Sequence, residues 1–212
     1  MVMFTEKQQN DNIRYERKYF LESEKYYLFK KFLINNGYTK NYDSRIVNSI
    51  YYDTDKFKYF KTNIEGLSRR LKVRARWYND NTKNKIIEFK IKNGFLGKKI
   101  YSDFFNEKDL INETLKKTGD LVKPIVKISY LREYFISPCQ KFRATVDNNI
   151  YTTIENSKIN FNKVYLNQTI LEFKYSLDND NIFRTFVNNI KFPFRFKKNS
   201  KYVTSLLSLK YL

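Results

Sequence analysis

Polar and apolar residues alternate along much of the chain, most clearly over residues 68–92. Four basic residues occupy every second position of one run, with apolar residues between them: Arg70, Lys72, Arg74 and Arg76. After a polar turn at 79–84, a second alternating run carries Glu88, Lys90 and Lys92. A period of two is typical of a β-strand, whose successive side chains point to opposite faces of the sheet. The two runs predict an antiparallel hairpin with one apolar and one basic face.

The same period recurs elsewhere and predicts further strands near residues 13–20, 45–53, 98–105, 124–135, 143–147, 164–166 and 170–175. Capping residues and apolar spacing predict helices between these strands. They lie near residues 23–37, 54–60, 106–117 and 179–190, with a last one that begins after Ser200. Asp53 in a Tyr-Asp-Thr turn is interpreted as a structural cap for the turn that follows it. The order of elements predicts an α+β fold.

Three predicted strands carry Glu-x-Lys on their polar face: Glu16 with Lys18, Glu88 with Lys90, and Glu172 with Lys174. Eight or so antiparallel strands of this kind could close into a barrel, with charged faces inward and helices packed outside. A row of like charges is also compatible with a solvated sheet face, and the hairpin alone does not decide between the two. A charged interior would repel itself when empty, so it predicts a bound polyanion, with a metal between glutamate and phosphate.

Length and charge set the broad class. Residues 1–12 are polar and predict a disordered tail, and residues 13–212 predict one domain. The 212 residues contain 41 Lys and Arg against 22 Asp and Glu, a net charge of +19. This excess predicts a polyanionic partner, which could be nucleic acid, an acidic membrane or a phosphate-rich molecule. No apolar run approaches the ~20 residues of a membrane span, and no signal peptide is recognisable, so a soluble, cytoplasmic chain is expected.

Two residue types narrow the chemistry. The chain has no histidine, which excludes Ser-His and Cys-His nucleophiles and histidine metal sites. Cys139 is the single cysteine, so an internal disulfide is excluded. A metal would be held by carboxylate oxygens, which suit Mg²⁺ or Mn²⁺. Aromatic residues such as Tyr15, Tyr19, Trp77 and Tyr175 fall on the faces opposite the charges and predict core, which argues against specific nucleic-acid binding.

Eight short motifs follow one another along the chain: Arg14-Tyr15-Glu16-Arg17-Lys18-Tyr19, Tyr51-Tyr52-Asp53-Thr54, Lys72-Val73-Arg74-Ala75-Arg76-Trp77-Tyr78, Glu88-Phe89-Lys90, Tyr130-Leu131-Arg132, Arg143-Ala144-Thr145-Val146-Asp147, Leu171-Glu172-Phe173-Lys174-Tyr175 and Ser200-Lys201-Tyr202. In this order they resemble the VTC (polyphosphate polymerase) domain of the triphosphate tunnel metalloenzymes, also called CYTH-like proteins. The resemblance implies an eight-stranded tunnel that moves the γ-phosphate of ATP onto a polyphosphate chain with a divalent metal, preferably Mn²⁺.

The resemblance also implies roles for individual residues. The basic residues that match the family's phosphate-binding positions are Lys18, Arg74, Arg76, Lys90, Arg132, Arg143 and Lys201. Lys198 is added by its place three residues before Lys201, and alternation adds Arg70, Lys72, Lys92 and Lys174. Glu172 matches the metal-binding glutamate, alternation adds Glu88 as a further metal ligand, and the Glu-x-Lys pattern adds Glu16.

Arg14 replaces the first glutamate of the wider superfamily's Glu-x-Glu-x-Lys motif, which favours the polymerase branch. A triphosphatase in the same tunnel and a non-catalytic polyphosphate-binding module remain alternatives. The partners expected are ATP and polyphosphate, with a membrane protein as a further partner at the inner face of the membrane.

Overall fold

The computed structural model describes residues 14–93, 96–103, 106–155, 163–190, 193–194, 196 and 200–209. Its strands are β1 (Arg14–Leu21), β2 (Thr39–Asp53), β3 (Arg69–Tyr78), β4 (Ile86–Asn93), β5 (Leu96–Asp103), β6 (Lys123–Ile136), β7 (Arg143–Ile154), β8 (Val164–Tyr165) and β9 (Thr169–Ser176). Its α-helices are α1 (Tyr26–Asn35), α2 (Lys58–Ile64), α3 (Glu107–Thr118), α4 (Asp180–Asn189) and α5 (Lys201–Ser208), with short 3-10 turns at Ser23–Lys25 and Leu177–Asn179. No helix in these ranges is long and apolar enough to span a membrane.

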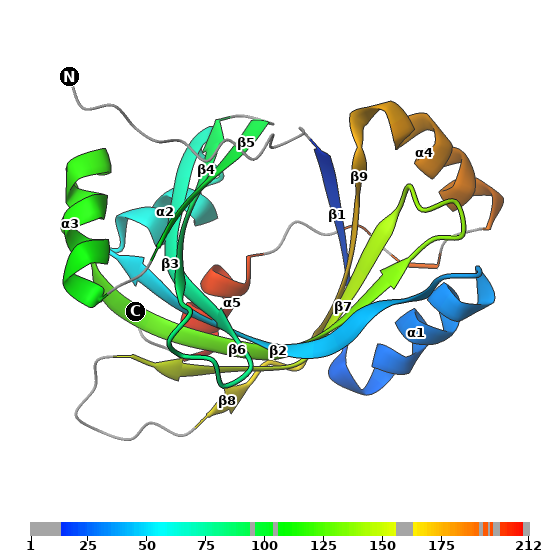
Figure 1. The fold of residues 1–212 in the computed structure, drawn as a ribbon, viewed down its shortest axis with the longest axis horizontal. Coiled ribbons are helices and arrows are strands. Elements are labelled where there is room, and N and C mark those ends of the chain that lie inside the picture. Colours follow the sequence, from blue (N-terminus) through cyan, green and yellow to red (C-terminus); the bar gives the residue numbers. More distant parts are fainter. Residues whose placement is uncertain are drawn as a thin grey trace.

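One antiparallel sheet dominates the structure, with the strand order β1-β9-β7-β6-β2-β3-β4-β5 and β8 added beside β7. Figure 1 shows this sheet curled into a deep trough, with α1 and α4 outside one wall and α3 outside the other. The predicted α+β fold with an antiparallel eight-stranded barrel is confirmed as a curled half-barrel, because no backbone pairing joins β1 to β5 in the described ranges. Among the named strands, β1 and β5 are the two ends of this order, and an isolated antiparallel bridge pairs Tyr19 of β1 with Phe196.

Alternation decides which face of each strand is covered. On β3, Val73 and Ala75 are fully buried and pack with Phe89 of β4 and Leu110 of α3 on the outer side. The charged residues between them therefore face the inside of the trough. A second outer cluster packs α1 and α4 against β7 and β9 through residues such as Phe173. The apolar face of the sheet thus packs against the outer helices, as expected.

Helix α5 lies on the inner side of the sheet, unlike α1, α3 and α4. Its Tyr202 and Leu206 pack with Tyr51 of β2 and Val126 of β6. Tyr51 is the Cα partner of Arg74 and of Val126, so these residues share the inner face. The expected layer of helices outside the barrel is therefore accompanied by one helix within the trough (Figure 1). This position brings the first residue of α5 into the interior.

Several boundaries differ from the predicted ones. Strand β2 begins at Thr39 and not near residue 45, because its first part pairs with the end of β6 through irregular register. Helix α2 begins at Lys58, four residues after the expected start. Helix α3 matches the prediction closely, since the Asn106 side chain accepts a hydrogen bond from the backbone N–H of Asp109 at 2.9 Å. Tyr15 was predicted to be core but is 37% exposed, because it lies near the start of an edge strand.

Asp53 has the structural role predicted for it. Its carboxylate is fully buried and accepts hydrogen bonds from the backbone N–H groups of Thr54, Tyr59 and Phe60 at 2.8–2.9 Å. The Tyr202 hydroxyl donates a further bond at 2.7 Å, which ties α5 to the end of β2. Asp53 therefore joins the start of α2 and the interior helix α5 in one buried network.

Replacing Tyr202 with phenylalanine is expected to lower the free energy of unfolding by about 1.5–3 kcal/mol, because it removes a buried bond to a charged acceptor. Urea denaturation measures this change. Tyr27→Phe is a suitable control, since Tyr27 is 56% exposed on α1. Equal effects of the two substitutions would contradict the structural role given to Asp53.

Candidate functional site

The basic row of β3 lies along the interior and contacts side chains of three other strands. Arg74 donates two hydrogen bonds to the Glu88 carboxylate and one to the Tyr51 hydroxyl at 2.9 Å. Arg76 donates to Ser49 Oγ at 3.1 Å and lies 3.6 Å from Glu88. Burial by itself would raise the pKa of Glu88, but Arg74 and Arg76 outweigh it and hold the pKa at about 2. The two guanidinium groups are therefore oriented by a permanently charged carboxylate.

A second cluster joins β6, β7 and α5 around Asp147, which is fully buried. Arg132 donates from Nε and a terminal nitrogen to the two Asp147 oxygens at 2.6 and 2.7 Å. Lys201, the first residue of α5, donates to the same carboxylate at 2.6 Å, and its ammonium group lies 4.5 Å from the centre of the Tyr130 ring. Burial opposes ionisation of Asp147, yet both cations keep its pKa well below the ordinary value.

A third cluster lies on β1 and β9, where cross-strand pairing interleaves acids and bases. Lys18 is the Cα partner of Glu172, and Glu16 is the partner of Lys174. Glu172 lies 3.6 Å from Lys174 and 3.9 Å from Arg132, so this cluster continues into the second. Burial opposes ionisation of Glu172, but Lys174, Lys18 and Arg132 lower its pKa well below the ordinary value.

Ion pairs connect β1, at one end of the sheet, with β4 and β5 at the other end, across the trough. Glu16 of β1 lies 2.9 Å from Lys90 of β4 and 4.0 Å from Lys99 of β5. Burial would raise the pKa of Glu16, but Lys90 counteracts it and the pKa falls to about 2. Side chains therefore bridge the two ends of the curled sheet at Glu16, and the interior of the half-barrel is lined with charge.

Several interior lysines repel one another. Burial and repulsion from Lys18 and Lys90 lower the pKa of Lys72 well below its ordinary value. Burial, joined by repulsion from Lys90, lowers the pKa of Lys99 to about 8. Burial likewise lowers the pKa of Lys174 to about 8, in spite of the neighbouring Glu172. The interior thus carries more positive charge than its carboxylates neutralise, and an anion bound there would relieve the repulsion.

Two carboxylates of the interior, Glu16 and Glu172, could hold a divalent cation together with a bound phosphate. Glu16 and Glu172 are diagonal neighbours on β1 and β9, and the charge of Glu172 opposes the lowering of the Glu16 pKa by the lysines around it. The described residues contain no group of three or more His, Cys, Asp or Glu side chains that could hold a metal. Mg²⁺ and Mn²⁺ commonly bind through one or two carboxylates plus phosphate oxygens and water, so this pair fits such an ion once a phosphate is bound. Glu88 is held by Arg74 and Arg76 instead.

Most of the basic residues predicted for the site share the interior face. The structure places Lys18, Lys72, Arg74, Arg76, Lys90, Arg132, Lys174 and Lys201 there, together with Arg70 and Lys92 as Cα partners at one end of the β3–β4 hairpin. Arg143 also lies on the interior face, opposite Lys174, but it is exposed because it is the first residue of β7. Lys198 lies outside the described residues. The roles given to these residues stay predictions.

Sequence reasoning missed four interior residues, namely Asp147, Lys99, Tyr51 and Tyr130. Asp147 ends the motif that begins with Arg143, to which only the arginine was assigned a role. The alternation of Arg143, Thr145 and Asp147 with Ala144 and Val146 predicts that Asp147 lies on the charged face of the strand. Lys99 lies in residues 98–105, where polar and apolar residues alternate only weakly, so its face of the sheet could not be predicted. Tyr51 and Tyr130 are aromatic residues whose hydroxyl groups contact interior arginines. Asp147, Tyr51 and Tyr130 all stand in the motifs quoted above, which is a signal that could have marked them, whereas Lys99 stands in none.

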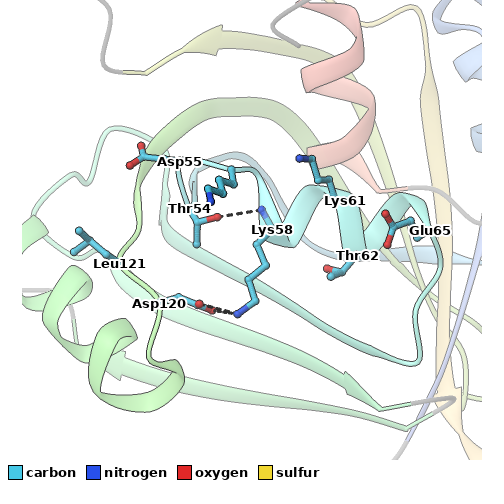
Figure 2. Close-up of a pocket in the computed structure, with 9 residues that line it drawn as sticks. Thr54, Asp55, Lys58, Lys61, Thr62, Glu65, Asp120 and Leu121 are labelled. Atoms are coloured by element: carbon cyan, nitrogen blue, oxygen red, sulfur yellow. Dashed lines mark hydrogen bonds and ion pairs between the residues drawn. The ribbon is translucent and has the colours of Figure 1, made fainter.

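Figure 2 shows an open pocket on a different part of the surface, beside α2. Its lining combines acidic and basic groups, and the Lys58 ammonium donates to Asp120 at 2.7 and 2.9 Å. None of the predicted site residues lines it. The interior of the curled sheet is therefore the better candidate for function.

Comparisons with known proteins agree with this arrangement. The family model described as the VTC domain matches residues 13–111 and 98–210. A candidate adenylate cyclase from Bacillus halodurans has a TM-score of 0.55 at 16% identity, over 89% of this chain and 95% of its own. A candidate adenylyl cyclase from Hippeastrum, described as having a dominant triphosphatase activity, has a TM-score of 0.54 at 11% identity, over 88% and 92%. Likeness at these identities shows a shared fold. A search of curated proteins finds no significant match.

Proposed function

Because the chain belongs to the VTC domain family, we propose that it is a polyphosphate polymerase-type phosphotransferase that uses ATP and a divalent metal. The observation that carries this proposal is the convergence of cations from separate strands and from α5 on one interior face. Arg74, Arg132 and Lys201 come from β3, β6 and α5, and buried carboxylates fix all three. Such a face suits a linear chain of phosphates better than a single anion. The proposal places the reaction in the cytoplasm, with a membrane protein as a possible recipient of the product.

Phosphoryl transfer requires that side chains position the reactants and stabilise charge, with little covalent participation. A terminal oxygen of the acceptor polyphosphate attacks the γ-phosphorus of ATP. The bond from that phosphorus to the β–γ bridging oxygen breaks, and ADP leaves with the electron pair. The attacking oxygen is ionised at neutral pH, so no side chain has to remove a proton from it. This agrees with the absence of histidine from the chain.

Basic residues supply the stabilisation. Arginine offers bidentate contacts to phosphate oxygens, and lysine offers a mobile point charge. Arg74 and Arg76 bind the phosphates from one wall, while Arg132 and Lys201 bind them from the floor. A divalent ion held by Glu172 and Glu16 would supply further neutralisation of the charge on the phosphate oxygens when bound. Mn²⁺ is the preferred ion in this proposal, with Mg²⁺ as the other.

A triphosphatase is the second candidate. One observation favours it, namely that the tunnel-fold neighbour from Hippeastrum is described as having triphosphatase activity. Water would then replace the polyphosphate end as nucleophile and would have to lose a proton. The two functions share the same phosphate-binding residues and differ in the acceptor.

Binding of a triphosphate is expected to take up protons near pH 8. Lys99 and Lys174 have a pKa of about 8, so about half of these groups are neutral at that pH. A bound anion favours the ammonium form and raises the pKa, so protons are taken up and affinity falls as the pH rises above 8. Calorimetric titration of tripolyphosphate at pH 8, in two buffers with different ionisation enthalpies, measures the uptake. Identical enthalpies in the two buffers would contradict this prediction, and Lys99→Met is expected to reduce the uptake.

The product of the reaction tests the proposed function directly. Purified protein is incubated with ATP and Mn²⁺, with and without a pyrophosphate primer, and the products are separated on a gel stained for polyphosphate. A ladder that disappears in the Arg74→Ala, Lys201→Ala double variant supports the polymerase. Free phosphate without a ladder supports the triphosphatase. Bound triphosphate with neither product would overturn both and leave a binding module.

A further inference from the structure

An aromatic and cationic cluster lies beyond the phosphate-binding face, at one end of the trough. It consists of Tyr42 and Arg45 of β2 and Tyr134 of β6, and we call it the Tyr42 shelf. The two tyrosine rings are perpendicular with centres 5.8 Å apart. The Arg45 guanidinium lies 6.0 Å from the centre of the Tyr42 ring and 5.9 Å from that of Tyr134. The three side chains therefore form one contiguous group.

The Tyr42 shelf is continuous with the interior. Arg45 is the Cα partner of Arg132, and Tyr134 follows Arg132 by two residues on the same face of β6. Further along β2, Ser49 and Tyr51 accept hydrogen bonds from Arg76 and Arg74. Arg45 and Ser49 are four positions apart on β2, which corresponds to about 13 Å along the strand. An extended nucleoside triphosphate can span this distance. One strand thus leads from the shelf to the arginines that hold phosphate.

The shelf has surface and charge left for a ligand. Tyr42 is 56% exposed and Arg45 is exposed as well. Among the described residues, Arg45 forms no ion pair with a carboxylate, so its charge is available to a phosphate.

The two ends of the interior differ in the side chains that line them. At the far end of β3, the inward positions are Arg70 and Lys72, opposite Lys92 and Lys90. That end is suited to phosphate alone, whereas the Tyr42 shelf pairs aromatic rings with a cation. Nucleic-acid bases stack on tyrosine rings and on arginine guanidinium groups, which is the combination found here.

We propose that the Tyr42 shelf binds the base of the nucleoside triphosphate donor, with its phosphates directed along β2 towards Arg76 and Arg74. This inference rests on the proposed function, since it needs a triphosphate in the interior. It gives the tunnel a direction, in which the nucleoside occupies the shelf end and the polyphosphate acceptor occupies the end formed by Arg70 and Lys92.

Calorimetric titrations with ATP and with inorganic tripolyphosphate, both in the presence of Mg²⁺, test the inference. Tyr42→Ala is expected to weaken ATP binding about tenfold and to leave tripolyphosphate binding unchanged, because only ATP carries a base to stack. Tyr42→Phe retains the ring and is expected to retain the affinity for ATP. Tyr27→Ala is the matched control, because Tyr27 is also 56% exposed but lies on α1.

The outcomes separate this inference from the proposed function. An unchanged affinity of Tyr42→Ala for ATP would overturn the shelf as a base site, and so would equal losses for ATP and tripolyphosphate. A wild-type protein that binds tripolyphosphate but not ATP would overturn the shelf while leaving a phosphate-binding interior. A wild-type protein that binds neither ligand would overturn the proposed function together with the shelf.

Discussion

Replacing Asp147 with asparagine is expected to lower the free energy of unfolding by about 3–5 kcal/mol, the cost of breaking a buried ion pair by removing one partner. Asp147 is fully buried and accepts from both Arg132 and Lys201. The neutral amide would leave two cations without their counterion. Because Lys201 begins α5, the loss would also weaken the attachment of this helix inside the trough.

The pH dependence of this effect follows from the pKa of Asp147. That pKa lies below the unfolded value of about 3.9, so the carboxylate contributes its full stabilisation at neutral pH. The contribution is lost as the pH falls through the folded-state pKa, and wild type and variant should then approach each other in stability. Urea denaturation at pH 7 and in acid measures both.

A bound anion should partly replace the missing carboxylate. Saturating tripolyphosphate is expected to raise the melting temperature of the Asp147→Asn variant more than that of the wild type. Asp55→Asn is the matched control, because Asp55 pairs with Lys123 at the surface and should contribute about 0–1 kcal/mol. Equal destabilisation by the two substitutions would contradict the role given to Asp147.

Glu172→Gln is expected to reduce metal-dependent turnover at least 100-fold, or about 3 kcal/mol in the activation free energy. Glutamine has nearly the same shape, but it removes one of the two carboxylates placed to hold the ion. Its neighbours Lys174, Lys18 and Arg132 would then have more charge available for an anion. Binding of tripolyphosphate without metal should therefore be retained or become tighter.

This pair of readouts separates a catalytic effect from a folding defect. Turnover is measured as a function of Mn²⁺ concentration, and tripolyphosphate binding is measured by calorimetry. Glu133→Gln is the control, since Glu133 is also buried but pairs with Lys30 of α1 at 3.0 Å. Full metal-dependent turnover in Glu172→Gln would show that the metal is not held by this residue.

The curled sheet could be predicted because its signal is local. Alternation along β3 assigned Arg74 and Arg76 to one face and Val73 and Ala75 to the other. The contacts confirm that division, because the two arginines pair with Glu88 while Val73 and Ala75 belong to an outer apolar cluster. The cap of α3 was equally local, since Asn106 lies three residues from the N–H that it accepts. Features set by neighbours in the sequence were therefore accessible without a structure.

The connections between distant elements could not be predicted in this way. Lys201 lies 54 residues from Asp147, and Lys90 lies 74 residues from Glu16. Both contacts depend on strand register and on how far the sheet curls, which no local pattern encodes. The interior position of α5 has the same origin, since its apolar residues could equally have covered the outer face.

The central claim is that the interior of the sheet, and not the overall charge of +19, binds a triphosphate. Calorimetric titration of tripolyphosphate tests it most directly with two double variants of equal charge. Lys72→Met with Lys90→Met changes the interior. Lys56→Met with Lys61→Met changes two exposed residues that line the pocket beside α2, of which Figure 2 labels Lys61. We predict one binding site, weakened at least 100-fold by the interior pair and unchanged by the surface pair. Equal weakening by both pairs would contradict the claim and indicate non-specific attraction of polyanions.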